Sequence, residues 1–470
     1  MALSPMMKQY FAIKEQYKDC LLMYRLGDFY ELFFDDALTT SRELELTLTG
    51  RNCGLEERAP MCGVPFHAAN SYIAKLVSKG YKVAICEQIE DPKEAKGIVN
   101  REVIRIITPG TIDIDEATSA KDNLYLASIY VNGSSSAIAY VDITTGEFNA
   151  LEIKDDGDCE QLIAELSRIV PREIICYSKD ASAFIDRYSK MSPETYINEI
   201  DDSYFKYSSC ADILKTQFGV TSLIPLDIQD RREITISAGA LLLYLMETEK
   251  QASPQIKHLN IKESDSGMVL DRSTMRNLEL LETQYNHSQK GSLLGVIDKT
   301  HTAMGGRLIR RFIKEPLNNS NAINKRLDAV EVLVDLPLNR ANIVASLKHV
   351  YDFERLTARI ASMRANGKDM VALKTTLHEL PAIKDELKHI DAPLLNEIFS
   401  SLDDFSSLEE LIENSIVDEP PFTITDGDLI KSGYSTELDN LKLSIKDAKA
   451  WITGLEAKEK ERTGIKNLKV

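Results

Sequence analysis

The sequence predicts a multidomain protein: a mixed α/β N-terminal domain, then a second α/β domain, then a long all-α region. At 470 residues the chain is too long for one hydrophobic core. Strand-type apolar runs are concentrated before about residue 230, and from Ile236 onward helical spacing dominates. A content of 43% hydrophobic and 27% charged residues is typical of a soluble globular protein, so two to four folded domains are expected.

The first domain, residues 1–112, mixes helical and strand patterns. Gly27 offers a sharp bend after an apolar strand, and Gly80 can end a helix that begins after Pro65. Asp35 can cap a helix that ends near Leu44. The expected helices are 6–18, 35–44 and 68–78, the expected strands are 20–25, 46–49, 81–87 and 103–108, and residues 51–58 are expected to form a polar loop.

The second domain, residues 121–233, begins with three strand-type runs at 124–131, 137–141 and 148–153. The turn signals Asn132-Gly133 and Thr145-Gly146 separate these runs, which predicts an antiparallel meander. A helix at 159–169 and a strand at 173–176 are expected to follow.

The helical region covers residues 236–435. Its expected helices are 238–249, 275–282, 306–314, 321–334, 341–349, 353–362, 370–378 and 405–414, with Pro316, Pro337, Pro381 and the pair Pro420-Pro421 between them. The last segment, 436–470, is expected to form one long charged helix from Leu438 to Glu461.

Charge and cysteine usage narrow the class of protein. The net charge of -17 argues against a chain that coats nucleic acid by bulk electrostatics, so any DNA contact must come from placed residues. The seven cysteines are odd in number and none has CxxC spacing, which predicts reduced, mostly buried thiols and no zinc site. The N-terminus has no apolar signal-peptide core, and the cytoplasm is the expected compartment.

One short stretch, Gly27–Phe33, reads G-D-F-Y-E-L-F and follows a buried strand. In an extended segment Phe29 and Glu31 point the same way, so one face presents an aromatic ring beside a hydrogen-bond acceptor. That pair suits probing a stack of bases. On composition alone, an ordinary strand with one buried Phe and a solvated surface acid is the favoured interpretation.

The same stretch resembles the mismatch-reading motif of the MutS family of bacterial DNA mismatch-repair proteins. Six more blocks are similar to family signatures in family order: Pro60–Ala68, Val83–Lys93, Arg101–Thr111, Leu270–Leu280, Gly305–Arg311 and Gly433–Asp439. The resemblance therefore spans nearly the whole chain, and it favours the base-probing interpretation.

The resemblance implies a role for each part of the chain. Residues 1–112 would form the mismatch-recognition domain, 121–233 an RNase H-like connector, 236–435 a helical core and lever, and 436–470 the start of a DNA clamp. Phe29 would stack at a mispaired or unpaired base in kinked duplex DNA, and Glu31 would hydrogen-bond to it.

The resemblance also implies an ATPase domain with ATP and Mg²⁺, a homodimer, a MutL-type partner and an association with the nucleoid. This sequence contains no G-x-x-x-x-G-K-[ST] motif, and Gly291–Gly295 lacks the Lys-Ser/Thr pair that a phosphate loop needs. We therefore expect a truncated family member that does not hydrolyse ATP, has no catalytic residue, cofactor or metal of its own, and is monomeric or weakly associating.

Four further residues are candidate DNA-backbone contacts: Arg51, Asn70, Lys466 and Lys469. Each is also compatible with a plain solvated surface position. An alternative function is an RNase H-like metal-dependent nuclease built on Asp142. Two-metal cleavage needs three or four convergent acids, and the downstream candidates Glu165, Glu173 and Asp180 form no recognisable set.

Overall fold

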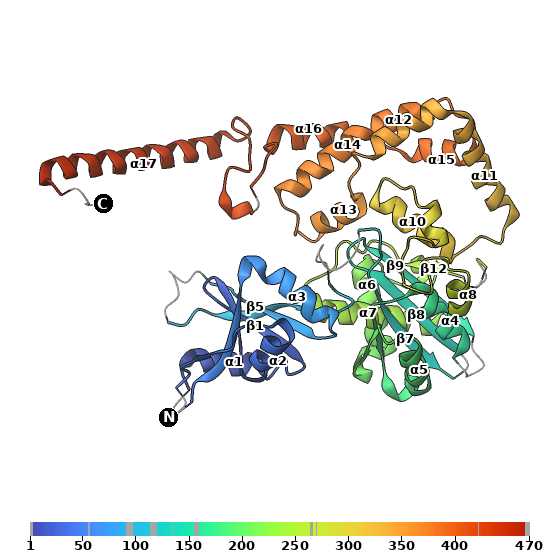
Figure 1. Ribbon diagram of the computed structural model, residues 1–470, viewed down its shortest axis with the longest axis horizontal. Coiled ribbons are helices and arrows are strands. Elements are labelled where there is room, and N and C mark those ends of the chain that lie inside the picture. Colours follow the sequence, from blue (N-terminus) through green and yellow to red (C-terminus); the bar gives the residue numbers. More distant parts are fainter. Residues whose placement is uncertain are drawn as a thin grey trace. The chain divides into compact units, whose positions relative to one another are not determined.

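The computed structural model describes residues 3–54, 57–90, 97–112, 120–133, 135–154, 159–263, 267–268, 270–421 and 423–465. The chain divides into two compact units. The first comprises Met1–Glu331 with Asp352–Met363, and the second comprises Val332–Tyr351 with Arg364–Val470. The first unit contains two six-stranded sheets, and the described part of the second is almost entirely helical (Figure 1).

The first sheet has the strand order β3-β4-β2-β1-β5-β6, in which only β1 and β5 run parallel. Its strands are β1 (Cys20–Leu26), β2 (Phe29–Phe33), β3 (Thr49–Arg51), β4 (Ala59–Pro65), β5 (Lys82–Gln88) and β6 (Arg101–Ile107). Three helices accompany it: α1 (Pro5–Lys14), α2 (Phe34–Leu44) and α3 (Ala69–Ser78). Alternate residues of β1 enter two separate apolar cores, because successive side chains of a strand point to opposite faces.

Three details of this domain differ from the sequence prediction. The predicted strand at 46–49 is wrong, because the strand begins only at Thr49. The prediction that Asp35 caps α2 is wrong, because the N-cap residue is Phe33. The neighbouring Asp36 has a different role: its carboxylate accepts a hydrogen bond from the Leu22 amide of β1 at 3.0 Å. Strand β4 was not predicted, because Pro60, Gly63 and Pro65 interrupt its apolar pattern.

The second sheet has the order β11-β10-β7-β8-β9-β12. The strands are β7 (Tyr125–Asn132), β8 (Ser135–Asp142), β9 (Glu147–Lys154), β10 (Glu173–Cys176), β11 (Tyr196–Glu199) and β12 (Asn260–Lys262). The first three form the predicted antiparallel meander, and β10 and β11 run parallel beside β7. Helices α4 (Glu160–Ile169), α5 (Ser178–Met191), α6 (Tyr207–Phe218) and α7 (Arg232–Glu249) complete this region.

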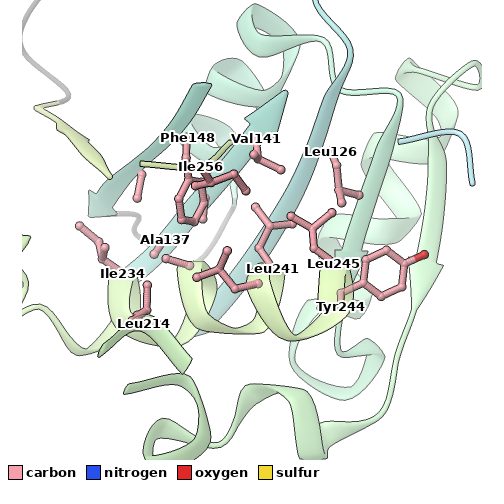
Figure 2. Close-up of a cluster of buried hydrophobic side chains, with 14 of the residues drawn as sticks. Leu126, Ala137, Val141, Phe148, Leu214, Ile234, Leu241, Tyr244, Leu245 and Ile256 are labelled. Atoms are coloured by element: carbon pink, nitrogen blue, oxygen red, sulfur yellow. The ribbon is translucent and has the colours of Figure 1, made fainter. Parts of the chain in front are cut away.

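Helix α7 packs on this second sheet. Its Leu241 and Leu245 share one core with Leu126, Val141 and other strand residues (Figure 2). Strand β12 also pairs with β9, so the structure of this region continues to residue 262. The sequence placed residues 238–249 in the helical region instead, because an apolar helical pattern does not reveal which surface will bury it.

Helices α6 and α7 meet at Gly239. A Cβ atom at this position would lie 2.3 Å from the Cβ atom of Cys210, so only glycine permits this approach. Cys210 is fully buried, and burial raises the pKa of its thiol to about 12. All seven cysteines are buried and none is in a disulfide, which confirms the prediction of reduced, buried thiols.

The rest of the first unit is helical. It contains α8 (Arg272–Asn277), α9 (Leu293–Ile297), α10 (Ala303–Lys314), most of α11 (Ser320–Asp335) and α13 (Phe353–Ala361). Arg307 of α10 is 4% exposed, and its guanidinium pairs with Asp352 at 2.7 Å and Glu354 at 2.6 Å. These pairs fasten the start of α13 to α10.

The second unit is built around α14 (Gly367–Leu387), which contacts α12 (Pro337–Leu347), α15 (Pro393–Ser401) and α16 (Ser406–Ser415). Helix α14 continues through Pro381, which the sequence analysis placed between helices. The predicted long charged helix is confirmed as α17 (Thr436–Thr463), which has no buried residue. Among the described residues, no helix combines the length and the apolar character needed to cross a membrane.

Candidate nucleic-acid interface

The predicted bend at Gly27 is a two-residue hairpin turn between β1 and β2. Leu26 pairs with Phe29, so Gly27 and Asp28 form the turn. Gly27 has φ +59°, a left-handed conformation that glycine adopts without strain. The turn therefore places Phe29 at the first position of β2, at the end of the hairpin.

Phe29 is exposed while the rest of its strand is largely buried. Its side chain is 46% exposed, whereas Tyr30 is 7% exposed and Leu32 and Phe33 are fully buried. Tyr30 and Leu32 enter one core of the domain, so Phe29 and Glu31 share the opposite face. An exposed ring on an ordered strand is available for contact with a ligand, which excludes the interpretation of Phe29 as a core residue.

A compact set of side chains supports the hairpin from behind. The hydroxyl of Tyr30 donates a hydrogen bond to Glu87 of β5, which also pairs with Arg25 at 3.3 Å. The guanidinium of Arg25 lies 4.0 Å from the ring centroid of Phe66, a cation–π contact. The Phe66 amide donates a hydrogen bond to the carbonyl of Asp28 at 3.0 Å. The hairpin tip is thus held by contacts that leave the Phe29 ring exposed.

Phe66 is a second exposed aromatic residue beside the hairpin, and it was not selected from the sequence. Its side chain is 44% exposed, and the preceding residue, Pro65, pairs with Phe29. Phe66 lies within the block Pro60–Ala68, but the sequence of that block alone does not reveal that it packs against the turn at Asp28.

Glu31 forms an ion pair with Arg51 of β3. Strand β4 lies between β2 and β3, and the residue opposite Glu31 on β4 is Gly63, which has no side chain. The Glu31 side chain is 16% exposed and that of Arg51 is 37% exposed, so a ligand can reach the pair. The structure therefore brings together two of the predicted site residues, which are 20 positions apart.

The other predicted backbone contacts have different outcomes. Asn70 is exposed at the second position of α3, and no side-chain partner of it is found among the described residues. Lys466 and Lys469 lie outside the described residues.

Three of the acids considered for a nuclease, Asp142, Glu165 and Glu173, do not form one site, and the side chain of Asp180 lies outside the described part of the structure. Asp142 is fully buried, and its carboxylate accepts hydrogen bonds from Asn123, from the Leu124 amide and from the amide and hydroxyl of Thr144, at 2.6–3.1 Å. Glu165 pairs with Arg168, and Glu173 accepts a hydrogen bond from the Gly110 amide. Within the described residues no cluster of His, Cys, Asp and Glu has the arrangement of a metal site. The nuclease interpretation is not favoured.

Comparison with protein families matches three domain models in succession. MutS domain I matches residues 4–116, MutS domain II matches 124–260 and MutS domain III matches 273–467. The domain II match includes α7 and ends at the first residue of β12, in agreement with their packing on the second sheet.

Several relatives share the whole length of this chain. DNA mismatch repair protein MutS of Alkaliphilus oremlandii is 48% identical over 472 residues, which cover 100% of this chain and 54% of the relative. The proteins of the same name from Ruminiclostridium cellulolyticum and Acetivibrio thermocellus are 47% and 46% identical and cover 99% and 100% of this chain. The chain spans about half the length of the curated relatives it matches.

The fold and these matches define a modular protein in which two α/β domains are followed by a helical domain, in the order of a single family. The chain belongs to the MutS family.

Proposed function

We propose that this chain recognises mismatched double-stranded DNA, with Phe29 as the wedge at the mispaired or unpaired base and Glu31 as its hydrogen-bonding partner. The observation that supports this most directly is the 46% exposure of Phe29 on a strand whose next residue is buried. Membership of the MutS family and the names of the relatives point to the same function.

The physical basis of the proposal is the cost of opening a base step. Inserting an apolar wedge unstacks two base pairs at a cost of a few kcal/mol, which a bent duplex offsets with additional contacts. A mispair is already poorly stacked and easily kinked, so the cost is smallest at the defect. Selectivity then comes from the deformability of the DNA, and one site can serve many mismatches.

In this proposal, Glu31 helps to distinguish mismatched from correctly paired DNA. A carboxylate close to the phosphates of correctly paired DNA is repelled and finds no base partner, whereas a displaced base offers a hydrogen bond. Arg51 is held beside Glu31 by their ion pair, from which it can also reach a phosphate. Asn70, exposed at the start of α3, is a second candidate for a phosphate contact.

The other regions receive their roles from the family. We propose that the β7–β11 region is the RNase H-like connector, that the helical region is the core and lever, and that α17 begins the clamp. In the whole protein we propose a homodimer, an ATPase domain that uses ATP and Mg²⁺, a MutL-type partner and a cytoplasmic, nucleoid-associated location. This chain itself is proposed to be a weakly associating DNA-binding protein without enzymatic activity.

The test compares the parent with Phe29→Ala on a G·T duplex and on its correctly paired twin, by fluorescence anisotropy. We expect the parent to prefer the G·T duplex and Phe29→Ala to lose about tenfold of that preference, since one base–aromatic stack contributes about 1–3 kcal/mol. The matched control is Phe11→Ala, because Phe11 is a similarly exposed phenylalanine on α1. Equal preference in parent and Phe29→Ala would contradict the role of Phe29, and no preference in the parent would contradict the proposed function of this chain.

A further inference from the structure

A cavity of about 270 Å³ lies between the second sheet and helix α10. Six of the side chains that line it are cationic: Arg168, Arg172, Arg307, Arg310, Arg311 and Lys314. The acidic side chains in the same wall are Asp122, Glu194 and Glu315. We call this cavity the basic pocket. It lies entirely within the first unit and is separate from the hairpin of Phe29.

Four of the arginines are held in place by carboxylates. Arg168 pairs with Glu165 and Glu315, and Arg307 with Asp352 and Glu354. Arg310 pairs with Asp122 at 3.2 Å, and Arg311 with Glu147 at 2.7 Å. These pairs fix the guanidinium groups around the pocket and neutralise most of their charge.

Three polar side chains of the wall have no hydrogen-bond or ion-pair partner within the part of the chain that the structure describes. Lys314 and Arg172 form no ion pair or side-chain hydrogen bond with any residue that the structure describes. Tyr140 of β8 is only 2% exposed, and its hydroxyl has no hydrogen-bond partner in the same described ranges. These three groups are hydrogen-bond donors in the wall of the basic pocket that no described side chain engages.

The charge of the pocket is also unbalanced. The pKa of Lys314 is lowered to about 8, chiefly by burial; Asp122 and Glu315 act against this effect, and the nearby charges of Arg168 and Arg310 add to it. A bound anion would stabilise the ammonium form and raise the pKa of Lys314 toward its usual value. An apolar ligand or a cation would leave the ammonium uncompensated.

We propose that the basic pocket binds a small phosphate-bearing anion, with Lys314 and Arg172 as its charged contacts and the Tyr140 hydroxyl as a third donor. The volume lies below the roughly 300–1,000 Å³ of pockets for drug-sized ligands, so the bound group has the size of pyrophosphate or of the phosphate chain of a nucleotide. Ammonium and guanidinium groups are the side chains that proteins use most for phosphate recognition.

A second cavity indicates how a larger ligand would extend. It has a volume of about 490 Å³ and shares five lining residues with the basic pocket: Asp122, Val170, Glu194, Arg310 and Lys314. Its wall also contains the apolar side chains of Met275, Leu281 and Leu294. A nucleotide could therefore place its phosphates in the basic pocket and its base in the second cavity.

The test is isothermal titration calorimetry of the 470-residue chain with sodium pyrophosphate in a phosphate-free, metal-free buffer. We expect saturable binding at one site. Lys314→Gln and Tyr140→Phe are each expected to weaken it, Lys314→Gln by at least about tenfold, because a charge-assisted hydrogen bond is lost. Tyr140→Phe keeps the ring in the core and removes only the hydroxyl, so it remains informative even if Lys314→Gln folds poorly.

Lys206→Gln is the matched control, because Lys206 is an exposed lysine in the second α/β region that does not line the pocket. A parallel titration with ADP distinguishes the two sources of phosphate: tighter binding of ADP than of pyrophosphate assigns a nucleotide, and the reverse assigns an inorganic anion. The proposal is overturned if neither titrant binds saturably, or if Lys314→Gln and Tyr140→Phe both bind like the parent.

Discussion

Arg51 and Glu31 form an ion pair that spans the glycine of an intervening strand. Both side chains are partly exposed, and a DNA phosphate would compete with Glu31 for the guanidinium. In the proposed function, the approach of DNA could therefore release the Glu31 carboxylate toward a base.

The Glu31 carboxylate is expected to weaken binding to correctly paired DNA. Glu31→Gln removes the negative charge and keeps the shape, so we expect severalfold tighter binding to a matched duplex and a smaller mismatch preference. Anisotropy titrations on both duplexes measure this, with Glu57→Gln as the control for a loop acid in the same domain. Unchanged affinity for the matched duplex would count against a role for Glu31 in discrimination.

Phe29 is expected to matter for binding and not for folding. Because its side chain is 46% exposed, Phe29→Ala should change the free energy of unfolding by less than about 0.5 kcal/mol. Leu32→Ala on the same strand should lower it by about 2–5 kcal/mol, because Leu32 is fully buried. Urea unfolding followed by circular dichroism checks both values. A large loss of stability in Phe29→Ala would assign the ring to the core after all.

Glu173 is expected to be essential for the junction between the two α/β regions. It is fully buried, and its carboxylate accepts hydrogen bonds from the Gly110 amide at 3.0 Å, Asn198 at 3.1 Å and the Tyr244 hydroxyl at 2.7 Å. Glu173→Ala removes the shared acceptor of these three donors, although Asn198 keeps its hydrogen bond to the Tyr244 hydroxyl at 2.9 Å. The change should lower the free energy of unfolding by about 2–4 kcal/mol. Thermal unfolding measures the loss. The exposed Glu160 provides the control, and a similar loss in Glu160→Ala would argue against this account.

Lys314 is expected to destabilise the folded chain at neutral pH in the absence of an anion. Burial lowers its pKa to about 8, against about 10.4 in an unfolded chain. Between these values the unfolded state binds more protons, so the contribution of Lys314 to stability rises with pH and its cost is greatest below pH 8. Lys314→Met should therefore be more stable than the parent at pH 7, by about 1–2 kcal/mol, and the difference should shrink toward pH 10.

Thermal unfolding in a phosphate-free buffer at pH 7 and pH 10 measures that difference, with Lys206→Met as the exposed control. A difference that is constant between the two pH values would contradict the assignment of a lowered pKa to Lys314.

Local patterns predicted most of the elements of this chain. The apolar run of β1, the turn signal Asn132-Gly133 and the helical spacing of α17 each depend on neighbouring residues, and the structure confirms them. Long-range packing was not predictable in the same way. Nothing in the apolar pattern of α7 indicates that it covers the second sheet, and the prolines and glycine of β4 conceal a strand that is paired on both sides.

In the candidate site, too, local geometry was predictable from the sequence and long-range contacts were not. The i, i+2 spacing predicted that Phe29 and Glu31 share a face, because that relation is set by the strand itself. The partner of Glu31 depends on the order β3-β4-β2, and the contact of Phe66 with the turn depends on the same pairing. Both required the three-dimensional structure.

The burial of every cysteine makes thiol alkylation a probe of local opening in this chain. A thiolate is the reactive form, so a sealed thiol such as Cys210, pressed against Gly239, cannot be alkylated until α6 separates from α7. The rate at which an alkylating reagent modifies Cys210 would therefore report how often α6 and α7 separate, without an added label.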